Sequence, residues 1–98
     1  MIDEKQKQLF HALKGIKDEY VITSLSKLEN GIETVDLEEH QNEIIESVLY
    51  SVMELIDGYN DDLGFAVDLI EKDTGQSLKG NIELHDKFMD YLNEVENN

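Results

Sequence analysis

Carboxylates are the residues of this chain whose number and placement could support chemistry. The 98 residues include 23 Asp and Glu against eight Lys and no Arg, which gives a formal net charge of −15. Paired carboxylates carry out acid and base catalysis in many enzymes, but nothing in so acidic a chain singles out one pair. The sequence also has no glycine-rich phosphate loop and no motif for an activated serine. We therefore predict that the protein is not an enzyme.

The histidines are the next candidates for chemistry, as metal ligands. His85 and Asp86 are adjacent, and His40 lies upstream as another candidate ligand. This His-Asp pair resembles the metal-binding pair of HD-class phosphohydrolases, and the resemblance covers the dipeptide alone. It implies a metal-dependent hydrolase, which we keep as a remote alternative. We instead expect His85 at the edge of the apolar face of a helix, with one ring nitrogen bonded to a carbonyl or a carboxylate.

Oxygen ligands of the kind that calcium prefers are dense in the segment 57–62. The segment lacks the alternation of ligand positions that an EF-hand loop requires. No His in the chain follows a Glu by three residues, the spacing used by carboxylate-bridged metal pairs in helical bundles. We therefore predict no metal site and no cofactor. The oxygen-bearing residues of the segment are Asp57, Asn60, Asp61 and Asp62.

The negative charge is concentrated in the middle of the chain. No basic residue lies between Lys27 and Lys72, whereas thirteen carboxylates do. Such a region repels the phosphates of nucleic acids and the anionic surface of membranes, and it attracts cations. We therefore predict a partner with a basic protein surface, and no binding of nucleic acid or membrane. The alternative is an acidic face that only keeps the protein soluble.

The totals limit the architecture and the compartment. Ninety-eight residues suffice for one domain, residues 1–98, with one hydrophobic core. The absence of Cys excludes disulfides, thiolate zinc sites and a cysteine nucleophile. The first residues do not resemble a secretory signal, and no apolar run approaches the roughly 18 residues of a membrane span. We expect a cytoplasmic protein.

The pattern of apolar residues predicts a mainly α fold, a small three-helix bundle with helices over about 3–30, 37–57 and 81–96. Proline is absent, and apolar residues recur at helical spacing in each range. Asp3 and Gln6 form a capping box, Asp36 suits the start of the second helix, and Gly58 suits its end. The alternative for the first range is a strand over 20–25 followed by a hairpin turn at residues 30 and 31.

The segment 63–78 is ambiguous. Phe65, Val67 and Leu69 alternate as in a strand, yet the same segment also fits a short fourth helix. The residues 72–75 suit a turn that ends on a left-handed glycine, which favours a short β-hairpin.

The second helix is expected to carry the binding site. Eight apolar residues cover most of its circumference and leave one acidic stripe for solvent, with Tyr50 as the anchor of an interface. We predict a non-catalytic acidic protein-interaction module, of the kind found in inhibitors, immunity proteins and nucleic-acid mimics. A homodimer in which Lys5, Lys7, Lys14 and Lys17 meet the acidic middle of a second chain is the alternative. The predicted partner-binding residues are Glu43, Glu46, Tyr50, Glu54, Asp57, Tyr59, Asp61 and Asp62.

Overall fold

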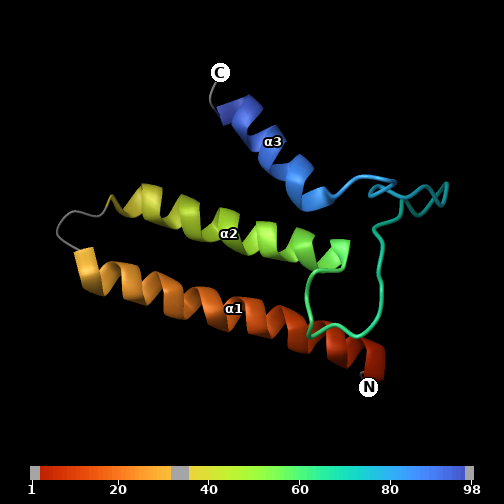
Figure 1. The fold of residues 1–98 in the computed structure, drawn as a ribbon, viewed down its shortest axis with the longest axis horizontal. Helices are drawn as coiled ribbons and strands as arrows, with labels where there is room; N and C mark the ends of the chain where they lie inside the picture. Colours follow the sequence, from red (N-terminus) through yellow and green to blue (C-terminus); the bar gives the residue numbers. More distant parts are fainter. Residues whose placement is uncertain (1–2, 32–35, 97–98) are drawn as a thin grey trace. The chain divides into compact units, whose positions relative to one another are not determined.

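The computed structural model describes residues 3–31 and 36–96. Three helices follow one another in the order α1 (Glu4–Gly31), α2 (Leu37–Asp57) and α3 (Leu84–Glu96), as Figure 1 shows. The prediction of a mainly α, three-helix chain is confirmed, and α1 passes through the range 20–25 for which a strand was the alternative. Among the described residues no helix is both long and apolar enough to cross a membrane.

The first two helices begin at the predicted capping residues. The backbone N–H of Gln6 donates to the Asp3 carboxylate at 2.7 Å, and the N–H of Asp3 donates to the Gln6 side chain at 3.1 Å. The Asp36 carboxylate accepts from the N–H groups of Glu38 and Glu39, at 3.0 and 3.2 Å. Both arrangements satisfy amides that have no partner within the helix. The short-range signals for these helix starts are therefore confirmed.

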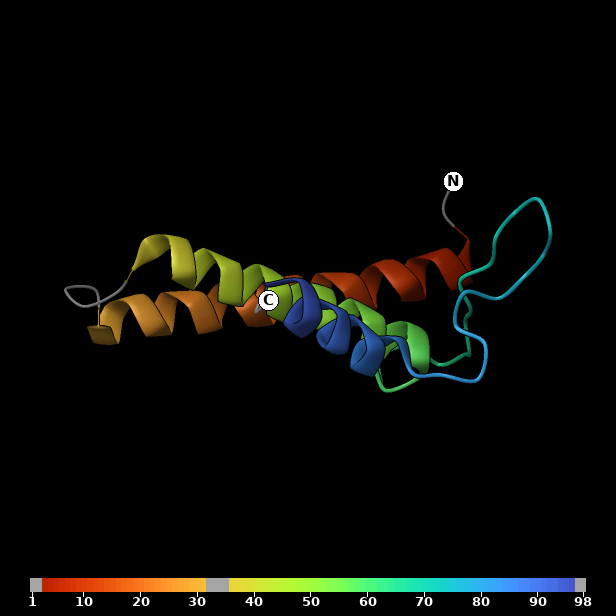
Figure 2. The same ribbon diagram turned by 90° about the horizontal axis from the view of Figure 1, so that it is seen from above.

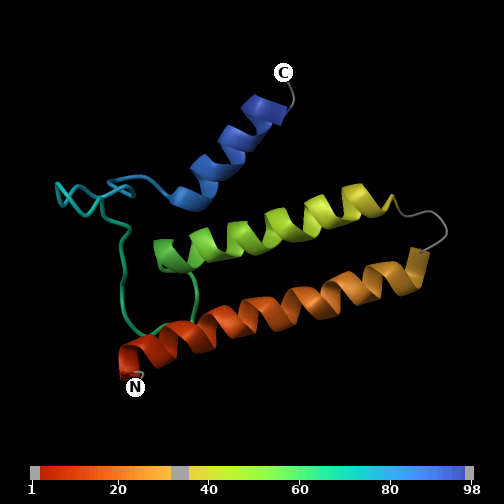
Figure 3. The ribbon, with the colours of Figure 1, turned by 180° about the vertical axis from the view of Figure 1, so that it is seen from behind.

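The chain divides into two compact units, Met1–Leu49 and Tyr50–Asn98, and the boundary falls within α2. The first unit contains α1 and the first part of α2. The second contains the rest of α2, a long loop and α3, and Figure 3 shows this loop leaving α2 and reaching the start of α3. Lys79 in the loop donates to the carbonyl of Ile56 at 3.1 Å. Its ammonium group thus gives a partner to a carbonyl in the last turn of α2. The single-domain organisation stays a prediction.

Within the first unit, the last part of α1 lies beside the first part of α2, which runs in the opposite direction (Figures 1 and 2). Ser24 Oγ lies 2.8 Å from Nε2 of His40, which is buried. Three residues further along each helix, Lys27 Nζ lies 3.6 Å from the Glu43 carboxylate. The hydrogen bond therefore gives a buried ring nitrogen its partner, whereas the exposed ion pair contributes little.

The apolar residues of α2 are less buried than the sequence pattern suggests. Only Leu55 among them is buried, at 2% exposure, while Ile45 and Leu49 are 58% and 42% exposed. The expectation that these apolar residues are covered is therefore wrong for Ile45 and Leu49, while five of the others are partly buried. The residues concerned are Ile44, Ile45, Val48, Leu49, Val52, Met53, Leu55 and Ile56.

Helix α2 ends at the predicted glycine. The N–H of Gly58 donates to the Leu55 carbonyl at 3.2 Å, and the N–H of Tyr59 donates to the Glu54 carbonyl at 2.9 Å. This pair of bonds is a Schellman motif, which requires a left-handed residue, and Gly58 has φ of 95°. The motif turns the chain sharply and fixes the positions of the residues on either side of the glycine.

The loop between α2 and α3 contains neither of the predicted elements. One isolated antiparallel bridge joins Ile70 and Ser77, and Leu78 N–H donates to the Leu69 carbonyl at 2.7 Å. Gly75 has φ of 76°, as expected for a left-handed turn residue. No strand and no fourth helix form in the described part of this loop, so the predicted hairpin is present only as a single bridge.

Candidate functional site

A buried carboxylate connects the end of α2 to the start of α3. The side chain of Asp57 is fully buried, and its two oxygens accept from the N–H groups of Leu84 and His85 at 3.0 and 2.9 Å. These are amides of the first turn of α3, which have no acceptor inside the helix. Asp57 therefore caps α3 from 27 residues away in the chain. The helix begins at Leu84, three residues after the predicted start.

The ring of His85 is held by the same carboxylate. Its Nδ1 lies 2.6 Å from Asp57 Oδ2, and its side chain is nine-tenths buried. Two tyrosine rings contact the imidazole, Tyr50 at a centroid distance of 5.4 Å and Tyr59 at 5.2 Å, and both are nearly perpendicular to it. Such T-shaped contacts are favourable for aromatic rings. His85 is therefore a fixed, buried residue, and the expectation of a boundary position is wrong, although the expected carboxylate partner is present.

The other ring nitrogen of His85 faces two further carboxylates. Nε2 lies 3.5 Å from Glu83 Oε2 and 3.6 Å from Asp86 Oδ1. The Tyr59 hydroxyl bonds to the second oxygen of Glu83, and this carboxylate raises the pKa of Tyr59 above 10.0. The three ligand atoms of Glu83, His85 and Asp86 all lie within 4.8 Å of one another. One imidazole nitrogen and two carboxylate oxygens thus converge at the start of α3.

The pKa values in this cluster follow from burial and charge. Burial alone would raise the pKa of Asp57, but the N–H donors of His85 and Leu84 and the His85 ring outweigh it and lower the pKa below 3.8. Burial alone would lower the pKa of His85, but the carboxylates of Asp57, Asp86 and Glu83 outweigh it and raise the pKa above 6.5. Folding therefore favours the ionised pair.

This pair makes stability depend on pH. Because the folded pKa of His85 is raised, its contribution is complete below pH 6.5 and is lost as pH rises through the folded value. The contribution of Asp57 is present above pH 3.8 and is lost as pH falls through its lowered value. In metal-free buffer, we expect a larger free energy of unfolding at about pH 6 than at about pH 8. Urea unfolding of the wild type and of His85→Gln tests this, since the variant should lose most of the difference.

The predicted partner-binding residues do not form one exposed stripe. The expectation that Asp57 faces solvent is wrong, because its side chain is buried against the first turn of α3. Tyr50 is half-buried with its ring against His85, which agrees with the alternative of a ring folded over the core edge. Tyr59 is exposed, with its hydroxyl bonded to Glu83. Of these three residues, only Tyr59 offers much of its ring to a partner.

The remaining predicted residues differ in exposure. Glu46 and Glu54 are half-buried on α2. Glu43 is exposed and paired with a lysine of α1, while Asp61 and Asp62 are exposed in the loop. The three exposed carboxylates remain accessible to a cationic partner.

Sequence reasoning missed an apolar surface on the first unit. A shallow pocket of about 330 Å³ lies between α1 and the first part of α2. Two of the residues that line it, Val21 and Leu25 of α1, are 52% and 54% exposed. Contiguous exposed apolar surface of this kind often marks a binding site. The lining residues are Lys17, Tyr20, Val21, Ser24, Leu25, Ile44 and Val48.

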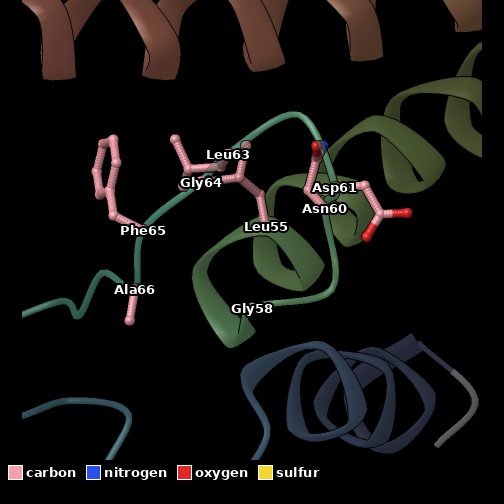
Figure 4. Close-up of a pocket in the computed structure, with 8 residues that line it drawn as sticks. All are labelled: Leu55, Gly58, Asn60, Asp61, Leu63, Gly64, Phe65 and Ala66. Atoms are coloured by element: carbon pink, nitrogen blue, oxygen red, sulfur yellow. The ribbon is translucent and has the colours of Figure 1, made fainter.

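A second pocket, of about 370 Å³, lies at the end of α2 within the second unit. Figure 4 shows Leu55 on the last turns of α2 beside the chain at Leu63 and Gly64, with the Asp61 carboxylate on the side away from Phe65. The pocket holds no histidine, and Asp61 is the one ionisable residue among those that line it. It therefore offers little for catalysis.

Comparisons of the chain with family models, with curated proteins and with solved structures find no match.

Proposed function

We propose that the protein is a non-catalytic, acidic interaction module that binds a cationic amphipathic segment of another protein. The observation that carries the proposal is the apolar pocket between α1 and α2, bordered by half-exposed Val21 and Leu25. An amphipathic helix recognised in a groove supplies apolar anchors at intervals of three and four residues. We expect the apolar side chains that line the pocket to contact such anchors.

The negative charge of the chain favours a partner whose polar face is positively charged. Residues 1–49 carry eleven carboxylates and five lysines, and the whole chain carries a net charge of −15. A lysine-rich or arginine-rich polar face would be attracted at long range, while an anionic one would be repelled. A second copy of this acidic chain fits less well for the same reason. In the cytoplasm, occupation of a basic surface on a toxin or nuclease would make the protein an inhibitor or immunity-type protein.

A defined peptide tests the proposal. The first probe is a fluorescent synthetic helical peptide with leucines at intervals of three and four residues and lysines elsewhere. The control peptide is identical except that glutamates replace the lysines. We expect the cationic peptide to bind, with an affinity that falls as salt rises, and the anionic peptide to bind at least about tenfold more weakly. Equal binding of the two peptides would contradict the role of charge.

Variants of the chain locate the site. Leu25→Ser removes an apolar side chain that lines the pocket, so the affinity for the cationic peptide should fall about tenfold, or about 1.4 kcal/mol. Ile22→Ser is the matched control, because Ile22 is on the same helix and is more exposed, at 68%, but does not line the pocket. Circular dichroism confirms that each variant is folded. If both variants bind as the wild type does, the site lies elsewhere, and a dimer that Leu25→Ser dissociates would identify a second copy as the occupant.

A further inference from the structure

The cluster at the start of α3 has the composition and spacing of a metal site. We propose that Glu83, His85 and Asp86 bind one divalent transition-metal ion, with Zn²⁺ as the best fit, through Glu83 Oε2, His85 Nε2 and Asp86 Oδ1. This site is independent of the pocket proposed for a protein partner, since all three residues belong to the second unit.

The distances around His85 Nε2 carry the argument. The two carboxylate oxygens lie 3.5 and 3.6 Å from this nitrogen, which is longer than the roughly 2.7–3.2 Å of a hydrogen bond. Ligands bound tetrahedrally at about 2.0–2.2 Å from one ion lie roughly 3.3–3.6 Å from one another. The two nitrogen-to-oxygen distances are therefore those of ligands of a common ion, and the two oxygens lie within 4.8 Å of one another.

The orientation of His85 supports the same conclusion. Its side chain is nine-tenths buried, and the bond from Nδ1 to the buried Asp57 carboxylate directs Nε2 toward Glu83 and Asp86. A neutral imidazole that donates through Nδ1 has its lone pair on Nε2. A cation bound at this lone pair takes the place of the Nε2 proton of the ionised ring and faces the same two negative carboxylates.

Two outer contacts hold the ligands in place. A carboxylate that accepts a hydrogen bond from the non-ligating nitrogen of a histidine is a recurrent feature of zinc sites, because it fixes the tautomer and the ring orientation. Asp57 provides this contact to His85. The Tyr59 hydroxyl bonds to Oε1 of Glu83 and leaves Oε2 for the ion.

The set of donor atoms selects the metal. Imidazole nitrogen suits Zn²⁺ and its neighbours among the transition metals, whereas Mg²⁺ and Ca²⁺ prefer sites made of oxygen alone. Three protein ligands leave the fourth position of a tetrahedral ion to water.

Titration calorimetry with Zn²⁺ on chelator-treated protein tests the proposal. We expect one ion per chain, and an affinity for Mg²⁺ at least about tenfold lower. Glu83→Gln and Asp86→Asn each remove one ligand charge from a partly exposed side chain, so both should stay folded and bind Zn²⁺ at least about tenfold more weakly. Asp90→Asn is the matched control, with the same loss of charge one helical turn further on, and should bind within about twofold of the wild type.

The Tyr59→Phe variant adds a test of the outer contacts. It removes the hydroxyl that bonds to Glu83 and no ligand atom, so it should weaken Zn²⁺ binding by less than Glu83→Gln does. No stoichiometric binding by the wild type would overturn the proposal. So would an equal loss of affinity in Asp90→Asn and Asp86→Asn, because the ion would then respond only to the net charge of the helix.

Discussion

Replacement of Asp57 by Ala is expected to lower the free energy of unfolding by about 3 kcal/mol. The substitution removes the acceptor for the first two amides of α3 and for the buried ring nitrogen of His85. Loss of a helix cap costs roughly 0.5–2 kcal/mol, and a buried polar group without its partner costs roughly 1–3 kcal/mol more. Small domains have only about 5–15 kcal/mol of stability, so the second unit should be strongly affected. Urea unfolding followed by far-ultraviolet circular dichroism measures the change.

Two further variants separate the cap from the charge. Asp62→Ala removes an exposed carboxylate from the loop of the same unit, and it should change stability by no more than about 0.5 kcal/mol. Asp57→Asn keeps one acceptor oxygen and should fall between the wild type and Asp57→Ala. An Asp57→Ala protein no less stable than Asp62→Ala would show that the carboxylate does not cap α3.

The parts of the fold that the sequence predicts are those whose determinants lie close together in the chain. Asp3 and Gln6 are three residues apart, and Asp36 caps amides two and three residues away. Gly58 ends α2 through bonds that reach back no more than five residues. Such features depend on local geometry alone, which is why the ends of α2 match the prediction.

The start of α3 shows why features that depend on residues far apart in the chain could not be predicted from local sequence signals. Its cap, Asp57, lies 27 residues before Leu84 and is brought there by the intervening loop. A signal was present, since the residue directly before the helix is Glu83, and no Ser, Thr, Asp or Asn stands there to cap it. A missing local cap indicates that the acceptor comes from elsewhere, but it does not identify the residue.

The acidic stripe fails as a site for a related reason. A helical pattern shows which residues share a face, but it does not show what covers that face. Tyr50 and Asp57 share a face of α2, and both are engaged by His85 of α3. The apolar residues predicted to be buried, such as Ile45 and Leu49, are instead exposed. Which face is covered depends on tertiary contacts that the helical period does not encode.

The core of the second unit depends strongly on Leu55, which is 2% exposed and is the most buried large apolar residue of α2. Leu55→Ala is expected to cost about 2–3 kcal/mol, near the lower end of the range for buried leucines. The reason is that Leu55 also lines the pocket at the end of α2, so the space it leaves joins an existing cavity that water can enter. An enclosed apolar cavity would stay empty and cost more.

The matched control for this prediction is Leu78→Ala, which shortens a leucine of the same unit that is 54% exposed. That variant should lose less than about 1 kcal/mol, because the side chain already contacts water in the folded state. Urea unfolding of both variants gives the comparison. The two free energies are comparable only if the free energy of unfolding of each variant depends on urea concentration with the same slope as that of the wild type. A cost of about 4–5 kcal/mol for Leu55→Ala would show that the space is closed to water. A cost equal to that of Leu78→Ala would show that Leu55 is not part of the core, because only side chains packed out of water lose both transfer energy and contacts when they are shortened.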